Sequence, residues 1–137
     1  MSFTRLQKIA LAVAGATSLG IGATIMGAPH VFYASYGIAI GTDPSLLSEV
    51  RALGAGLTGF GTVMLAGIIW SPLRQTAFVA ALTVFLAFPA GRLVSLVADG
   101  VPSTGILSAL GLELAIAALC LFAFRRRTTA PARMAVS

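Results

Sequence analysis

Few residues in this chain could do chemistry, and the most informative of them lie in the stretch 88–102, FPAGRLVSLVADGVP. Within it, Arg92, Ser95 and Asp99 are separated by three and four residues. Such separations return to one side of a helix, so the three side chains are expected on one face. An arginine within an apolar span costs about 2.5–3.5 kcal/mol on insertion scales. Arg92 therefore needs a partner of opposite charge.

Glu113 is the acidic residue best placed to pair with Arg92. A helix rises about 1.5 Å per residue, which puts Arg92 about 10 Å from the end of its span at Asp99. Glu113 lies roughly eight residues into the following span, or about 12 Å from the same side of the membrane. Two opposite charges at matching depth are expected to form an ion pair. The full candidate cluster, whether ligand-binding or structural, is Glu49, Arg51, Arg92, Ser95, Asp99 and Glu113.

The sequence leaves three interpretations of this cluster open. It can hold helices in register, as buried ion pairs do in some proteins. It can line an outward-facing pocket for a small polar, anionic or lipid-like ligand, or it can belong to an active site. No catalytic residues are predicted, because no Ser-His-Asp arrangement, phosphate loop or dinucleotide fingerprint occurs. The single histidine and single cysteine, His30 and Cys120, are far apart, so neither a metal site nor a cofactor is expected.

The composition indicates a membrane protein. Of 137 residues, 58% are hydrophobic and 9% are charged, and the mean hydropathy is +0.97. Soluble domains carry about 25% charged residues, so this chain cannot cover a water-facing surface. The sequence pI of about 10.8 does not indicate nucleic acid here, because the basic residues lie at the ends of apolar segments. The expected fold class is an all-α, integral membrane four-helix bundle.

Four apolar segments are long enough to cross a bilayer, which takes roughly 20 residues each. Residues 1–127 would form a single four-span domain, and residues 128–137 a cytoplasmic tail that is expected to be disordered. The spans are expected at about 9–28, 50–70, 76–97 and 105–124.

The first span carries two further expectations. Its basic lead-in and apolar stretch also fit a signal peptide, but no clean small-residue cleavage site precedes Pro29, which favours a retained span. Small side chains that let a neighbouring helix approach closely recur every four residues along it. This predicted contact face is Ala16, Gly20, Thr24 and Ala28.

The connection that follows is mildly polar and rich in aromatic residues. Phe32, Tyr33 and Tyr36 suit the headgroup region, so this segment is expected to lie at the membrane interface. Asp43 or Ser45 can then cap the start of the next helix.

Basic residues are distributed unequally between the two sides of the predicted bundle. Seven lie at the chain ends and in the second connection without any acidic residue, whereas the other side has two basic and four acidic residues. The positive-inside rule therefore predicts that both termini are cytoplasmic. The seven are Arg5, Lys8, Arg74, Arg125, Arg126, Arg127 and Arg133.

A resemblance adds to this interpretation. Asp43-Pro44, Glu49-x-Arg51-Ala-Leu-Gly, the segment GRLVSLVADGVP from Gly91 to Pro102, and Glu113 together resemble a family of small bacterial four-span proteins. That family is classed as a domain of unknown function, and the resemblance extends from the first span to about Phe124. It implies a multi-pass protein of the bacterial inner membrane and supplies no activity, substrate or cofactor.

Three classes of function are consistent with these observations. The leading hypothesis is a non-enzymatic accessory protein, or one that binds a lipid or small ligand through an outward-facing polar cluster. The alternatives are a small oligomeric transporter subunit and, third, a membrane enzyme acting on a lipid-soluble substrate. The expected surroundings are the lipid bilayer, with either a membrane-protein partner or further copies of the chain.

Overall fold

The computed structural model describes residues 3–125, and all the regular structure in that range is helical. Four of its helices are long and apolar enough to cross a membrane. This confirms the all-α fold with four candidate spans. The predicted tail at 128–137 lies outside the described residues. In chain order the elements are α1 (Arg5–Gly27), α2 (Pro29–Ala34), α3 (Pro44–Ile69), the 3-10 helix η1 (Ser71–Leu73), α4 (Arg74–Asp99) and α5 (Thr104–Phe124).

Helices α1 and α3 begin before the apolar segments that predicted them, because polar residues cap their first turns. Thr4 and Gln7 form a capping box at the start of α1, each side chain bonding the other's backbone N–H at 3.1 Å. Asp43 caps α3 by accepting a hydrogen bond from the N–H of Leu46 at 3.1 Å. Pro44 occupies the first position of α3, where no N–H is needed.

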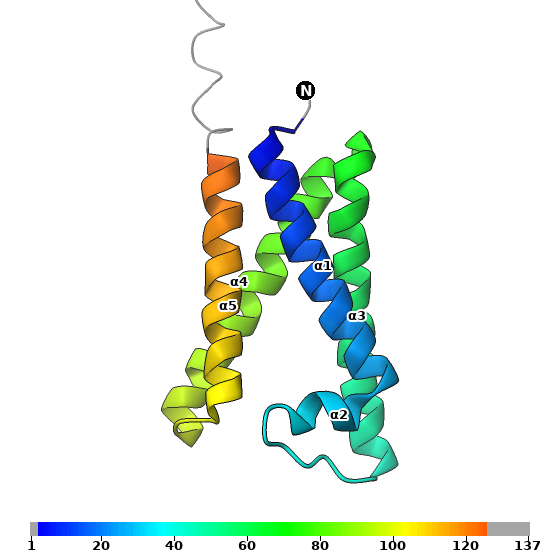
Figure 1. The fold of residues 1–137 in the computed structure, drawn as a ribbon, viewed down its shortest axis with the longest axis vertical. Helices are drawn as coiled ribbons and strands as arrows, with labels where there is room; N and C mark the ends of the chain where they lie inside the picture. The colour runs from blue at the N-terminus through cyan, green and yellow to red at the C-terminus, as the bar shows by residue number, and fades with distance from the viewer. Residues whose placement is uncertain (1–2, 126–137) are drawn as a thin grey trace, which may run out of the picture.

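The four long helices run alternately up and down, and they diverge toward one end of the molecule (Figure 1). α1 and α3 pack side by side, while α4 begins next to α3 and crosses to lie next to α5. The starts of α1 and α4 and the ends of α3 and α5 form what we call the basic end. At the opposite end the α1–α3 and α4–α5 pairs are separated, and α2 lies between them.

α1 and α3 approach until their backbones touch. A Cβ atom placed on Gly22 would lie 2.5 Å from the carbonyl oxygen of Gly54. One placed on Gly61 would lie 2.6 Å from the backbone nitrogen of Leu19. Only glycine fits at these points. Close contact between small residues is how helices associate in lipid, where burial of apolar surface drives little association.

The contact face of α1 differs from the predicted one. Ala16, Gly20 and Thr24 are exposed, and a Cβ atom on Gly20 would meet nothing within 4 Å. The prediction was wrong because α1 carries two sets of small residues and the spacing alone does not choose between them. Gly15 and Gly22, seven residues apart and therefore on one side of the helix, form the actual contact.

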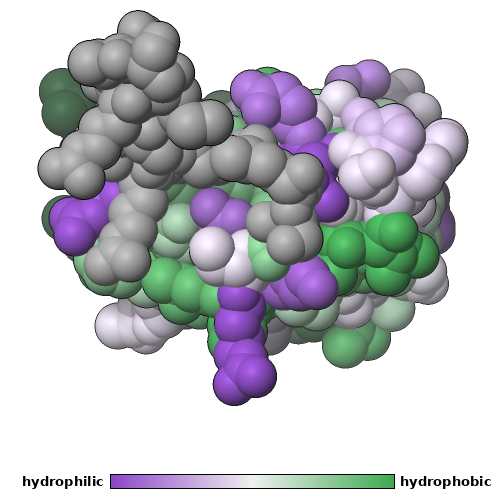
Figure 2. Space-filling model, turned by 90° about the horizontal axis from the view of Figure 1, so that it is seen from above, coloured by the Kyte–Doolittle hydropathy of each residue, from purple (hydrophilic) through white to green (hydrophobic). Residues whose placement is uncertain are grey.

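Aromatic side chains close the bundle near its basic end. The rings of Phe78 and Phe124 stack with centroids 4.2 Å apart, and Phe3 meets Phe124 edge-on at 5.5 Å. The guanidinium of Arg74 lies 4.6 Å from the centre of the Phe3 ring. Seen from this end, hydrophilic side chains are spread over the described surface, with strongly apolar side chains at its edge (Figure 2). Cys120 is fully buried nearby, as expected for a small apolar side chain.

Candidate functional site

Arg92 and Glu113 form a bidentate ion pair between α4 and α5. The Nε of Arg92 donates to Oε1 of Glu113 at 2.8 Å, and a terminal guanidinium nitrogen donates to Oε2 at 3.0 Å. Two parallel charge-assisted bonds fix both side chains in position. The pairing expected from their depths is therefore present. Neither side chain is fully buried, since 24% of Arg92 and 13% of Glu113 are exposed.

A tight connection between α4 and α5 sets the register of this pair. Gly100 follows α4 with a φ of 96°, a conformation that side-chain-bearing residues rarely adopt. The chain then starts α5 at Thr104 and returns antiparallel to α4. Because the connection is short, residues equally far from it on the two helices come level, and this places Arg92 opposite Glu113.

The other predicted cluster residues do not join the pair. The hydroxyl of Ser95 donates to Oδ2 of Asp99 at 3.2 Å, so these two interact with each other at the exposed end of α4. Arg51 donates instead to the backbone carbonyl of Met26, which ties α3 to the end of α1. Glu49 is exposed on α3. Within residues 3–125, no hydrogen bond or ion pair connects these four side chains to Arg92 or Glu113.

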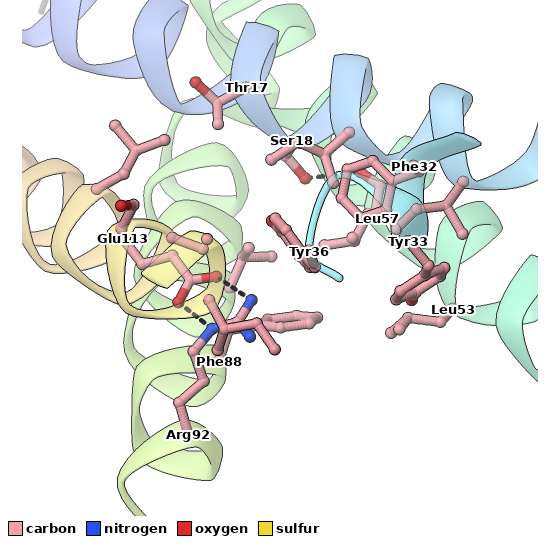
Figure 3. Close-up of a pocket in the computed structure, with 18 of the residues that line it drawn as sticks. Thr17, Ser18, Phe32, Tyr33, Tyr36, Leu53, Leu57, Phe88, Arg92 and Glu113 are labelled. Atoms are coloured by element: carbon pink, nitrogen blue, oxygen red, sulfur yellow. Dashed lines mark hydrogen bonds and ion pairs between the residues drawn. The ribbon is translucent and has the colours of Figure 1, made fainter. Parts of the chain in front are cut away.

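A cavity of about 430 Å³ lies beside the ion pair, between the two separated helix pairs. We call it the central cavity. Arg92 and Glu113 reach into it from one side, and α1 and α3 form the other (Figure 3). Its wall is mostly apolar. The apolar lining residues are Ile21, Ile25, Phe32, Ile38, Leu53, Leu57, Val84, Phe85, Phe88, Ile106, Ala109 and Leu112.

Two tyrosines also line the central cavity, and the sequence did not reveal this role. Tyr33 and Tyr36, which the sequence predicts at the headgroup level, are both partly buried and face the space near Arg92 (Figure 3). The available signal was Pro29, which can start a short helix; Tyr33 lies in this helix and Tyr36 in the turn just after it. Burial raises the pKa of both phenols above the ordinary value, so both are neutral and can donate at physiological pH.

The central cavity has several N–H and O–H donors that bind no group among residues 3–125. Arg92 has five N–H groups and uses two on Glu113, leaving three that make no hydrogen bond in the described part of the chain. The hydroxyls of Tyr33 and Tyr36 also donate to no group between residues 3 and 125. Both carboxylate oxygens of Glu113 are already engaged. These donors are therefore available to the acceptor oxygens of a bound molecule.

Comparison with known proteins bears on this site. Residues 6–124 match the family described as Domain of unknown function (DUF4345). The chain belongs to that family. The matched range takes in nearly all of α1, the whole of α3, α4 and α5, and every residue of the central cavity. The predicted resemblance to a four-span family of unknown function is thereby confirmed. No curated protein and no solved structure matches the chain.

This DUF4345 chain brings together groups suited to binding. His30 on α2 is exposed, and its Nε2 lies 2.6 Å from the carbonyl oxygen of Gly41. This hydrogen bond joins α2 to the connection that follows it. Over residues 3–125, no three His, Cys, Asp or Glu side chains are close enough to hold a metal ion. A fixed guanidinium and two phenols at the edge of an apolar cavity can instead hold the polar end of a lipid-soluble molecule.

Proposed function

We propose that this protein is a multi-pass, non-enzymatic protein of the inner (plasma) membrane that binds a lipid-soluble small molecule in the central cavity. In this proposal its four spans act as one domain. The observation that carries it is the set of unused N–H groups of Arg92 beside a mostly apolar cavity.

The size and lining of the cavity support binding rather than a purely structural role. Sites for small molecules occupy about 300–1,000 Å³ and are mostly apolar with a few placed polar groups. The central cavity, at about 430 Å³, fits this description. A pair of residues that served only to join α4 to α5 would not need a cavity beside it.

The charge of the site narrows the kind of ligand. Glu113 neutralises Arg92, so the pair adds no net charge to the cavity wall. A carbonyl, ether or hydroxyl oxygen could accept from the remaining N–H groups without an unpaired charge being buried, which is costly in an apolar environment. The proposed ligand thus has an apolar body and one or more acceptor oxygens.

Filling the cavity tests this function. Ala109 lies in the cavity wall on α5, whereas Ala118 is exposed on the same helix and away from the cavity. Native mass spectrometry of protein purified in mild detergent should show a retained small molecule on the wild type and on Ala118→Trp. Ala109→Trp should lose it, because an indole would occupy the space. Equal retention by both variants, or none by the wild type, would refute the proposal. The same spectra count the copies in the particle and reveal any partner.

The proposed orientation places the basic end in the cytoplasm, in agreement with the positive-inside rule. A reporter that is active only in the cytoplasm should be active when inserted after Leu73. It should be inactive when inserted after Gly100, at the opposite end. Cytoplasmic activity at Gly100 would show that the bundle is inserted the other way round.

A further inference from the structure

We propose that the ligand enters the central cavity sideways from the bilayer, through a groove between α4 and the start of α5. This inference rests on the proposed function, because it assigns an entry route to the same binding site. We call the groove the lateral groove. It is lined by Ala87, Phe88, Gly91, Arg92, Ser95, Pro102 and Ile106.

The lateral groove and the central cavity share part of their walls. Phe88, Arg92 and Ile106 line both spaces. These three side chains therefore form the partition between them, and a shift of the Phe88 or Ile106 side chain would join the two. Side chains of this kind change rotamer far faster than helices move, so no helix needs to separate.

The lateral groove faces lipid rather than water. Ala87, Gly91 and Ser95 are four residues apart along one side of α4 and are all exposed. From Ala87 to Ser95 the helix rises about 12 Å, so the groove runs from near the connection between α4 and α5 well into the apolar span. An acyl chain or ring system in the bilayer can thus reach it without crossing water.

Arg92 can bind the polar end of a ligand along this route. It lies in the partition, with three N–H groups left after pairing with Glu113. A molecule with an acceptor oxygen at one end can bind these groups from the groove and keep that contact as its apolar body passes Phe88. By contrast, the rings of Phe3, Phe78 and Phe124 pack against one another near the basic end of the bundle.

Gly91 allows the groove to be blocked without disturbing the fold. A Cβ atom at this position would meet nothing within 4 Å, so a larger side chain would extend into the groove. Leucine is also a better helix former than glycine. Gly111 on α5 is the matched control, since its Cβ would also meet nothing and it lines neither space. Ala87→Leu provides a second block from the deeper end.

The experiment uses phosphatidylcholine vesicles containing the protein, and the probe is the methyl ester of a long-chain fatty acid with a diazirine on its chain. The probe is added, the sample is irradiated at successive times, and crosslinked peptides are identified by mass spectrometry. Leu57 and Phe85 report occupancy of the cavity, because they are only 7% and 3% exposed and cannot be reached from outside. Crosslinking there should be slowed at least about tenfold in Gly91→Leu and Ala87→Leu, as expected when binding requires a rearrangement. Gly111→Leu should react like the wild type.

The possible failures are distinguishable. Wild-type rates of crosslinking at Leu57 and Phe85 in both blocked variants would overturn the lateral route and leave ligand binding intact. No crosslinking at these two positions in any chain would instead contradict the proposed function. The melting temperature of each variant, compared with that of Gly111→Leu, tests whether the blocked variants are folded.

Discussion

Replacing either Arg92 or Glu113 by leucine should lower the free energy of unfolding in detergent by about 3 kcal/mol, because each change leaves the other charge unpaired beside an apolar cavity. Changing both residues together should recover much of this loss. Unfolding of the wild type, the two single variants and the double variant gives the interaction energy directly as a double-mutant cycle.

Glu49→Leu is the matched control for loss of a carboxylate. Glu49 is exposed on α3 and makes no contact with the ion pair, so its replacement should change stability little. Strictly additive losses in the Arg92 and Glu113 variants would mean that the two side chains do not stabilise each other. The bidentate hydrogen bonds would then contribute nothing to the free energy of unfolding.

The double variant also separates the two interpretations of the pair. If Arg92 and Glu113 only join α4 to α5, the double variant should fold and still retain a ligand in native mass spectra. Under the proposed function it should fold and lose the ligand, because leucine supplies no donors. Stability and retention are measured on the same sample, so an unfolded variant cannot be mistaken for one that has lost its ligand.

Placing leucine at Gly22 or at Gly61 should destabilise the protein by at least about 3 kcal/mol, since overpacking costs this much when the neighbouring atoms cannot move. Here the nearest neighbours are backbone atoms of the facing helix, and they would lie 2.5–2.6 Å from the added Cβ atom. Helices α1 and α3 would have to separate along their whole contact. Denaturant unfolding in detergent measures the loss.

Gly59→Leu controls for the change of residue type on α3. Gly59 is exposed, and a Cβ atom there would meet nothing within 4 Å, so this variant should be as stable as the wild type or slightly more so. Wild-type stability in Gly22→Leu and Gly61→Leu would show that the close contact of α1 and α3 is not what holds the bundle together.

The features that the sequence predicted are those that depend on position along the membrane normal. Length and hydropathy set the four spans, and the rise per residue set the depths of Arg92 and Glu113. Their pairing follows because consecutive helices joined by a short turn lie next to each other. These arguments need only distances along one axis, which residue numbers supply.

The features it did not predict depend on rotation about a helix axis and on lateral position. The sets Ala16–Gly20 and Gly15–Gly22 on α1 are equally small, and only the glycines of α3 decide which one is in contact. Tyr33 and Tyr36 suit the interface as well as a cavity, and the cavity that they line exists only because the two helix pairs diverge. Such choices depend on the partner helices, which no single segment describes.

Arg92 precedes Glu113 by 21 residues, and this separation imposes a delay during synthesis. A ribosome adds roughly 5–20 residues per second, so the carboxylate is made on the order of 1 to 4 seconds after the arginine. The exit tunnel of the ribosome encloses a longer stretch of chain than these 21 residues, so Arg92 is still inside it when Glu113 is joined to the chain. The two charges then emerge one shortly after the other, and the guanidinium needs water, lipid headgroups or the insertion machinery only until Glu113 follows. The positions of these two charges thus favour release of the last two spans into the bilayer together, as a hairpin.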